Sequence, residues 1–559
     1  MSRPSALVAA PGVAALSARN ISKRRANAVI LDTVSVAIVP GRRIGVVGAN
    51  GAGKTTLLRL LAGLDSPDEG VVERAPATAT VGYLPQERSA RRDETMLAYI
   101  RRRTGVTEAT ASLEESAHAL TSGSPEVETA YSVALERFLA LGAADVDARA
   151  STVCGQLGLS DQLLEVAMSD LSGGQRARAA LAAIALARFD VLLLDEPTND
   201  LDFEGLEILE SFLLGASGGM AVVSHDRAFL ERIVTSVLEI DEHSRRAVEH
   251  RGGYAAYLEQ RATARRHASE AFETYSAERK RLLARIRAQR QWAAHGVVRA
   301  KKDLSEPDKN VRGARIESSE RLAAKVRTSE RAIERLDRDH PEKPWEGWEL
   351  RLELPVLDKA SEVVAFLDGA VIERGGFRLG PVNLEVRRRE RVGIVGANGS
   401  GKTMLIEALL GRVPLASGRQ GVGSGTVVGE LDQARRLVAE SPQLLRTFAA
   451  RTAWPEGEVR KLLAKFGLGA THVLRAPTTL SPGERTRAEL ALLMACPTNC
   501  LILDEPTNHL DIAAIEQLEQ ALEAYSGTML VVTHDRRLME ALELTRVIEL
   551  PNLRSRQLA

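Results

Sequence analysis

Two glycine-rich segments have the residue types and spacing of a phosphate-binding loop. The first reads GANGAGKT from Gly48, and the second reads GANGSGKT from Gly396. Glycines let consecutive backbone N–H groups converge on phosphate oxygens, the following helix directs its positive end there, and the lysine adds a point charge. The residues expected to contact a bound nucleotide are Gly48, Asn50, Gly51, Gly53, Lys54, Thr55 and Thr56 in the first loop and Gly396, Asn398, Gly399, Gly401, Lys402 and Thr403 in the second.

An Asp-Glu pair at the end of an apolar run accompanies each loop, in VLLLDE from Val191 and CLILDE from Cys500. Such a run is typical of a buried parallel strand, whose carboxyl end lies where ligands of these sheets bind. In each pair the aspartate, with the loop threonine, is predicted to hold Mg²⁺, and the glutamate to act as general base toward an attacking water. The metal ligands would be Asp195, Thr55, Asp504 and Thr403, and the bases Glu196 and Glu505.

A histidine follows a second apolar run in each half of the chain, in AVVSH and LVVTH. Histidines at strand ends are usually structural. His225 and His534, however, both lie 29 residues after the proposed bases. We therefore assign both histidines to the reaction sites.

The elements that carry these residues occur twice, because the chain is an internal repeat. The phosphate loops are 348 residues apart, whereas LSGGQRARAAL and LSPGERTRAEL, the two DEPTN segments and the two histidines are 309 residues apart. The first copy therefore holds 39 extra residues between its loop and its LSGGQ segment. Gln86 and Gln433 are 347 residues apart, so nearly all of this insertion follows Gln86.

The repeat predicts two α/β domains, at residues 14–260 with an arm-like insertion at about 88–165, and at residues 345–559. Residues 261–344 differ from both, because they are rich in Arg, Lys, Ala and Glu. We expect two helices of roughly 30 residues there, joined by a break at LSEPDKNVRGAR. Residues 262–340 carry 20 Lys or Arg against 12 Asp or Glu, although the whole chain has 74 of each. A charged helix is often only a solvated face, but this concentration favours a phosphate backbone as partner.

Composition excludes several classes of protein. With 44% hydrophobic and 26% charged residues, the chain is neither disordered nor fibrous. No segment reaches the roughly 20 consecutive apolar residues that span a bilayer, and the first residues do not resemble a signal peptide. Three cysteines without a CxxC pair favour a reducing compartment, so we expect a cytoplasmic protein.

The order of the phosphate loop, the glutamine, LSGGQ, DEPTN and the histidine resembles the ATP-binding cassette superfamily in both domains. The resemblance implies a RecA-like α/β core with a helical subdomain that bears the LSGGQ signature. It also implies that two cassettes close head to tail around two ATP molecules and Mg²⁺. Two cassettes without a membrane domain, joined by a charged helical linker, resemble the ABC-F subfamily in particular.

Each site implied by the resemblance combines one cassette with the signature of the other, and the glutamines would serve both Mg²⁺ and catalysis. Site one would combine Lys54, Thr55, Gln86, Asp195, Glu196 and His225 with Ser481, Gly483 and Glu484. Site two would combine Lys402, Thr403, Gln433, Asp504, Glu505 and His534 with Ser172, Gly173, Gly174 and Gln175.

Two departures from the family pattern concern the nucleotide. Pro482 in the second signature has no N–H to offer a phosphate, so site one is expected to differ from site two. Arg24 and Arg25 stand where the family has an aromatic residue that stacks on adenine, and Phe377 is the candidate in the second domain. Guanidinium stacking by Arg24 would replace the aromatic contact.

Three functions compete on the sequence. The favoured one, implied by ABC-F, is an ATPase that binds the ribosome, with ribosomal RNA and P-site tRNA contacted by the linker and the arm-like insertion. It would either protect against an antibiotic or control elongation. The alternative is the ATPase subunit of a drug exporter with a separate membrane protein. A DNA-maintenance ATPase is disfavoured, because it would carry long coiled coils within the cassette or zinc-binding cysteines.

Overall fold

A computed structural model of the chain describes residues 14–25, 28–85, 93–120, 124–187, 189–199, 201–302, 309–338, 340, 354–357, 361–374, 376–431, 443–452, 454–508, 510–550 and 554–557. The chain divides into two compact units. One joins Met1–Ala255 with Trp348–Ala559 and holds both repeats, and the other is Ala256–Gly347.

The first repeat is built on a six-stranded sheet in the order β5, β6, β7, β3, β8, β9. Neighbouring strands are parallel except β8 and β9. The apolar runs of the parallel strands are largely buried, as expected where helices cover both faces of a sheet. The strands are β3 (Arg43–Val47), β5 (Val81–Leu84), β6 (Val191–Asp195), β7 (Gly219–Val223), β8 (Ser236–Ile240) and β9 (Ala247–Arg251).

A smaller antiparallel sheet, in the order β2, β1, β4, completes the core of this repeat. Side chains of both sheets and of helix α1 form one apolar cluster, which includes Leu16, Leu57 and Leu193. This packing fixes α1 directly after β3, and the phosphate loop is the connection between them. The elements are β1 (Ala15–Arg25), β2 (Ala28–Ile38), β4 (Glu69–Ala75) and α1 (Lys54–Ala62).

The second repeat has the same two sheets, ordered β14, β15, β16, β12, β17, β18 and β11, β10, β13. Its loop likewise joins a central strand, β12, to a helix, α11. The strands are β10 (Val363–Arg374), β11 (Phe377–Arg387), β12 (Arg391–Gly396), β13 (Ser417–Val422), β14 (Val428–Leu431), β15 (Cys500–Asp504), β16 (Thr528–Val532), β17 (Arg546–Leu550) and β18 (Arg554–Gln557), and α11 is Lys402–Leu409.

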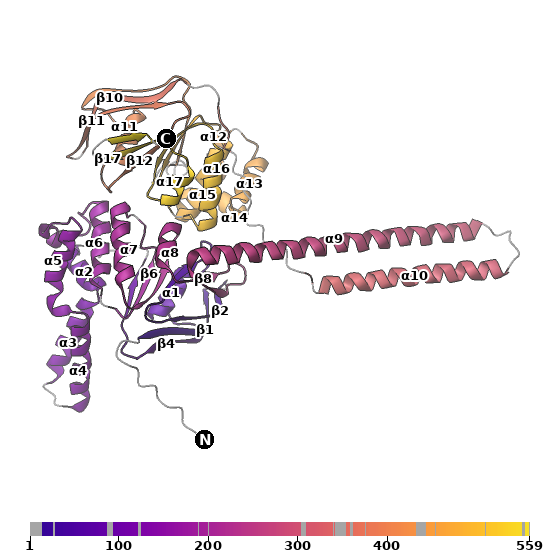
Figure 1. The fold of residues 1–559 in the computed structure, drawn as a ribbon, viewed down its shortest axis with the longest axis horizontal. Coiled ribbons are helices and arrows are strands. Elements are labelled where there is room, and N and C mark those ends of the chain that lie inside the picture. Colours follow the sequence, from indigo (N-terminus) through magenta and orange to yellow (C-terminus); the bar gives the residue numbers. More distant parts are fainter. Residues whose placement is uncertain are drawn as a thin grey trace. The chain divides into compact units, whose positions relative to one another are not determined.

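Helices after β5 and β14 form the region that ends in the signature helices α6 and α15. In the first repeat α3 and α4 form an additional hairpin (Figure 1). The arm is therefore narrower than the predicted 88–165, because α2 and α5 correspond to α12 and α13. The helices are α2 (Met96–Arg103), α3 (Val106–Ala119), α4 (Pro125–Ala140), α5 (Val146–Gln156), α6 (Gly173–Leu186), α12 (Leu444–Thr452), α13 (Glu456–Lys465), α14 (Ala470–Val473) and α15 (Pro482–Ala495), with short 3-10 turns at Ala143–Asp145, Asp161–Glu165 and Pro477–Thr479.

Two further helices in each repeat follow the Asp-Glu pair and the histidine. They cover part of the main sheet and carry residues that reach the other repeat. They are α7 (Phe203–Gly215) and α8 (Arg227–Ile233) in the first repeat, and α16 (Ile512–Ala524) and α17 (Arg536–Ala541) in the second.

The linker forms two long antiparallel helices, α9 (Gly253–Lys302) and α10 (Lys309–Arg338) (Figure 1). Tyr275 Oη donates to Asp337 Oδ1 at 2.6 Å, and Arg290 pairs with Glu330 at 2.6 Å, so polar bonds join the two helices. At 50 residues, α9 exceeds the expected length, and the expected break is too long because α10 already begins at Lys309. One glycine, Gly296, costs only about 1 kcal/mol within a run of good helix formers.

Side chains at the linker tip, from 292 to 323, lie outside the described residues. Among the helices of the described ranges, none is both long enough and apolar enough to cross a membrane.

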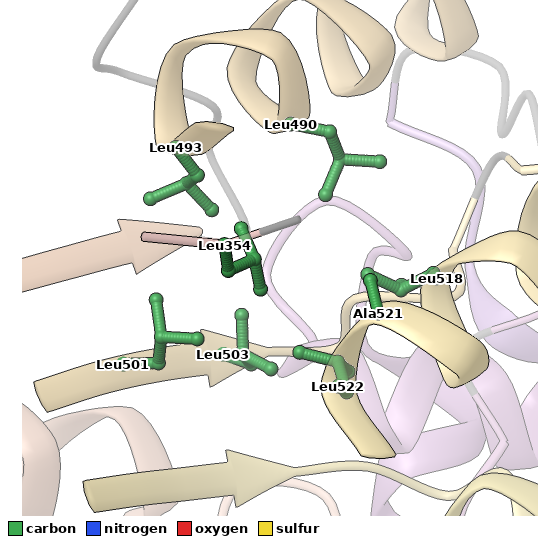
Figure 2. A pocket seen from close by; sticks show the side chains of 8 residues that line it. All are labelled: Leu354, Leu490, Leu493, Leu501, Leu503, Leu518, Ala521 and Leu522. Carbon is green, nitrogen blue, oxygen red and sulfur yellow. The ribbon is translucent and has the colours of Figure 1, made fainter. Parts of the chain in front are cut away.

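The segment after the linker is anchored to the second repeat. Thr498, just before β15, forms a bridge with Val356, and its N–H donates to Pro355 O at 3.0 Å. Leu354 points among leucines of α15, β15 and α16 (Figure 2). Residues 354–357 are thereby attached beside the strand that carries Asp504.

Candidate nucleotide sites

The two lysines of the phosphate loops lie across their own loops. Lys54 Nζ donates to Gly48 O at 2.7 Å and Ala49 O at 3.1 Å. Lys402 Nζ makes the equivalent bonds to Gly396 O at 2.8 Å and to the following alanine carbonyl at 3.2 Å. Both lysines are buried, and burial lowers the pKa of each. Each ammonium group is placed to meet a phosphate group that enters the loop.

The first glycine of each loop cannot be replaced without displacing the backbone around it. Gly48 has φ 152° and Gly396 has φ 154°, a region that side chains rarely adopt. A Cβ atom would lie 2.6 Å from Ile240 O at Gly48 and 2.7 Å from Leu550 O at Gly396. The loops therefore have the tight, backbone-lined form that a phosphate requires.

The aspartates end β6 and β15, and each contacts the threonine of its own phosphate loop. Thr403 Oγ1 donates to Asp504 Oδ2 at 2.9 Å, and the Thr55 side chain hydrogen-bonds to Asp195. Asp195 also accepts from Tyr83 Oη at 3.4 Å. A hydroxyl and a carboxylate side by side are oxygen ligands that Mg²⁺ prefers, so the donor set fits this ion.

Both proposed bases have a left-handed backbone, with φ 50° at Glu196 and 49° at Glu505. Such a conformation is costly for a non-glycine residue and is often found at functional sites. Their backbone N–H groups still bond to the neighbouring strand, at Val223 O and Val532 O. The turn therefore leaves the strand intact while it redirects the carboxylate, and burial raises the pKa of Glu196 to about 8.

The histidines contact these glutamates in both repeats. The His225 backbone N–H donates to Glu196 Oε2 at 3.3 Å, and that of His534 donates to Glu505 Oε2 at 3.4 Å. Each ring also lies near its glutamate, since His225 Nε2 is 3.0 Å from Glu196 Oε1 and His534 Nε2 is 3.4 Å from Glu505 Oε1. The rings differ in that His534 Nε2 also lies 3.1 Å from Lys402 Nζ. Burial and the positive charge of Lys402 lower the pKa of His534 to about 4.

The signatures begin the helices α6 and α15 with a capping box. Ser172 accepts from the N–H of Gln175, and the Gln175 side chain accepts from the Ser172 N–H at 2.9 Å. Ser481 and Glu484 make the same pair of bonds. Gln175 and Glu484, both expected to contact nucleotide, are therefore engaged with their own helices.

Each phosphate loop is also bound by the other repeat. The Asn50 N–H donates to Asp511 Oδ2 at 3.2 Å, and the Asn398 N–H donates to Asp202 Oδ2 at 3.0 Å. The other carboxylate oxygen of each aspartate caps the start of its own helix, α16 or α7. A Cβ atom on Gly174 would lie 3.0 Å from Asn398 Cβ, so the first signature faces the second loop.

Asp202 and Asp511 are functional candidates that the sequence analysis missed. Both stand in the motif DEPTNxLD, so the repeat itself contained the signal. Their partners are 196 and 461 residues away along the chain, which the local pattern could not reveal.

The surroundings of the loop helix differ between repeats. The nearest atoms to a Cβ on Gly401 are those of the Phe377 ring, at 3.0 Å. At Gly53 the neighbours are Ile30 and Leu31 instead. Arg24 is exposed on β1, and its backbone N–H donates to Asp68. Among the described residues no contact joins the Arg24 side chain to the first loop, so the structure gives no support to the expected guanidinium contact.

Several expected site residues cannot be placed. Gln86 and Gln433 lie outside the described residues, and so does the side chain of Pro482. Of the remaining residues assigned to the loops, Gly51 lies between β3 and α1, Gly399 lies between β12 and α11, and Thr56 lies in the first turn of α1. Gly173 and Gly483 lie in the first turns of α6 and α15.

Comparisons with known proteins agree with this geometry. The ABC transporter family matches residues 31–199 and 379–508. The tylosin resistance ATP-binding protein TlrC of Streptomyces fradiae is 36% identical over 94% of this chain and 95% of its own length. The energy-dependent translational throttle protein EttA of Mycobacterium tuberculosis is 31% identical over 93% of this chain and 88% of its own. A solved structure described as RNase-L Inhibitor covers 97% of this chain and 90% of its own, with a TM-score of 0.55 and 19% identity, which shows the fold alone.

The matched segments hold both phosphate loops and both Asp-Glu pairs, which defines a tandem ATP-binding protein. The chain belongs to the ABC transporter family, and within it to the ABC-F type of tandem ATPase. Its two cassettes are domains of the kind that bind and hydrolyse ATP.

Proposed function

We propose that this chain is an ATPase that binds the ribosome while its two cassettes are closed on ATP and Mg²⁺. In that state the linker reaches toward the peptidyl-transferase centre and alters translation or displaces a ribosome-targeting antibiotic, and hydrolysis leads to release. The observation that carries the proposal is the pair of bonds from Asp511 to Asn50 and from Asp202 to Asn398, which makes each phosphate loop part of a surface shared by both cassettes.

The residues of each site divide the chemistry between them. At site two, Lys402 and the loop N–H groups neutralise phosphate charge, and Thr403 with Asp504 would hold Mg²⁺, which polarises the phosphate when it is bound. Glu505 accepts a proton from the attacking water, and the neutral His534 ring orients the site. Site one uses Lys54, Thr55, Asp195, Glu196 and His225 in the same way. Gln86 and Gln433 are proposed to contact Mg²⁺ and the water.

Exposed cations on the linker support a nucleic-acid partner. Arg265, Arg266, Arg281 and Arg285 are all exposed on α9. Phosphates of ribosomal RNA or P-site tRNA would neutralise these charges, and binding would weaken as salt is raised. A ribosomal partner implies a cytoplasmic protein that works as a monomer, because both cassettes are present in one chain.

The relatives narrow the proposal. TlrC is named for tylosin resistance and EttA for a translational throttle, so the two names concern drug tolerance and translation. We favour antibiotic protection for this chain, because the relative with the higher identity of these two is the resistance protein. The drug-exporter alternative would need a separate membrane protein and leaves the basic linker without a role.

Co-sedimentation with ribosomes tests the proposal. The double variant Glu196→Gln, Glu505→Gln replaces each carboxylate by a carboxamide of the same shape that cannot act as a base, and it should be trapped on ribosomes in ATP. Lys54→Ala, Lys402→Ala is the matched control and should stay in the supernatant. Absence of the first variant from the ribosomal fraction would refute ribosome binding and favour the exporter function.

Drug susceptibility separates protection from control of elongation. Cells that express the full chain should tolerate a peptidyl-transferase or exit-tunnel inhibitor, and cells that express the chain without residues 293–313 should not. Unchanged tolerance to every such inhibitor would overturn the protection function and favour control of elongation.

A further inference from the structure

Two ion pairs between the cassettes lie behind the nucleotide sites. Arg227 on α8 pairs with Glu519 on α16, and Arg536 on α17 pairs with Glu210 on α7 at 3.0 Å. The two arginines are 309 residues apart and so are the two glutamates, which makes the pairs equivalent under the internal repeat. Because an arginine of each cassette pairs with the equivalent glutamate of the other, the contact differs from a chance surface pair.

Both pairs are shielded from water. The side chains of Arg227 and Glu519 are 6% and 12% exposed, and those of Arg536 and Glu210 are 23% and 7% exposed. Pairs that are largely removed from water interact more strongly than surface pairs, and removal of one member is costly. These contacts therefore differ in kind from the exposed pair of Arg537 with Glu231 at the same interface.

Each pair connects two elements that belong to a single nucleotide site. Arg227 comes two residues after His225 of site one, and Glu519 lies on the helix that Asp511 caps. Asp511 in turn binds Asn50 in the loop of site one. The same relation holds at site two for Arg536 and Glu210, through His534, Asp202 and Asn398.

We propose that Arg227 with Glu519, and Arg536 with Glu210, are positioning pairs that hold the histidine helix of each site against the opposite cassette when the cassettes close. Each site is then joined to the opposite cassette by two contacts, the bond from the aspartate to the loop and the ion pair. Asp511 and Glu519 are eight residues apart, about 12 Å along a helix. Because the two contacts are separated by this distance, they fix the orientation of the loop relative to the histidine. The inference rests on the proposed ATP-dependent closure.

The two pairs differ in a way that selects the better test. Glu210 also accepts from Arg232 of its own cassette at 2.6 Å, and Arg536 also lies 3.6 Å from Glu207 and over the Phe203 ring. A reversed charge at Glu210 would therefore disturb more than one contact. Within the part of the chain that the structure describes, Glu519 forms an ion pair with Arg227 alone, so exchange of these two charges disturbs fewer other contacts.

The experiment measures closure directly by energy transfer between two dyes. Dyes are attached at Glu69→Cys and Glu456→Cys, both exposed, in the full chain with Glu196→Gln, Glu505→Gln and Cys496→Ser. Arg227→Glu should shift the ATP concentration at half-closure upward by about tenfold or more, because the opposed charges become alike. Binding of a fluorescent ATP analogue to the open protein should be unchanged, since the loops are intact.

Charge exchange distinguishes a specific pair from general destabilisation. Arg227→Glu with Glu519→Arg should restore most of the closure, whereas Arg227→Glu with Glu210→Arg, the wrong partner, should not. Arg419→Glu, which breaks an exposed pair with Asp368, is the control and should close like the parent. Closure of Arg227→Glu at the parental ATP concentration, or equal rescue by both exchanges, would overturn the inference. Failure of the parent itself to close with ATP would instead refute the proposed function.

Discussion

At site two the ring of Phe377 lies against Gly401 of the loop, whereas at site one Gly53 lies against the aliphatic Ile30 and Leu31. The first signature, which faces site two, has Gly174 close to Asn398, while the second signature begins its helix with Pro482. The frameworks are nevertheless alike, since both lysines, both glutamates and both interface aspartates have matching geometry. The repeat therefore preserves the residues that are proposed to bind phosphate and varies the side chains that lie beside the start of the loop helix.

The largest expected effect is a difference in ATP turnover between variants of the two proposed general bases, Glu505 and Glu196. Glu505→Gln should lower steady-state ATP turnover by about 100-fold, the usual scale for loss of a general base. Glu196→Gln should leave the larger part of turnover, because site one faces the signature in which Pro482 lacks an N–H. Phosphate release by both single variants measures the difference. Equal losses would contradict a functional asymmetry between the sites.

Loss of the residue that is proposed to stack on adenine should give the next largest effect. Phe377→Ala should weaken ATP binding to the second cassette by about tenfold, since stacking on an aromatic ring contributes roughly 1–3 kcal/mol per base. Ile30→Ala should have a smaller effect on the first cassette, and Arg24→Ala should have none. Titration with a fluorescent nucleotide, with the other loop disabled by Lys54→Ala or Lys402→Ala, reports each site by itself. A loss of affinity in Arg24→Ala would show that its guanidinium group does contact the nucleotide.

A pH effect is expected at the interface between the histidine helices. Burial and the nearby Asp535 raise the pKa of Asp226 to about 6, against the opposing influence of Arg536 and with Glu210 adding to the rise. The folded protein thus holds this proton to a higher pH than the unfolded chain does. The contribution to stability is present below about pH 4 and is lost as the pH rises through 6.

Asp226→Asn removes that dependence. Asparagine caps a helix as well as aspartate does, so the bond to the Phe229 N–H should remain. The melting temperature at pH 7.5 should rise by about 2 °C or more, while at pH 4 variant and parent should melt together. A variant that melts lower at pH 7.5 would show that the charge of Asp226 is favourable.

The smallest expected effect concerns the packing of residues 354–357 on the second cassette. Leu354→Ala should cost about 1–2 kcal/mol in the unfolding of that cassette, less than a fully buried leucine, because the side chain is only partly buried. Leu474→Ala, at an exposed leucine, is the matched control. Urea unfolding followed by separate probes in each cassette should show no change in the first. A loss confined to the first cassette would contradict this packing.

The sequence predicted the fold class and most of the candidate site, because phosphate chemistry is carried by residue types at fixed local spacing. Gly48, Lys54 and the Asp-Glu pairs could be recognised without knowledge of their neighbours. Asp202, Asp511 and the interface arginines could not, since their partners lie hundreds of residues away. The surroundings of Gly53 could not be predicted either, for a related reason. The pairing of β1 with β2 decides which side chain meets Gly53, and composition does not reveal that register.

The linker shows the opposite limit of sequence reasoning. Turn-forming residues predict a break over LSEPDKNVRGAR, yet α10 already includes VRGAR. Isolated glycines are tolerated where the surrounding residues favour a helix and a partner helix is held by ion pairs. Local composition therefore located the turn but overestimated its length.

Cleavage by trapped vanadate tests most directly whether each site is shared by both cassettes. Vanadate takes the place of the leaving phosphate and, on irradiation, cleaves the backbone nearest to it, which mass spectrometry can map. In Lys402→Ala the second loop cannot trap vanadate. The cut at Ser172 in the opposite signature should therefore be lost, and the cut at Ser481 should be retained. Loss of the cut at Ser481 with the cut at Ser172 retained would contradict the shared sites.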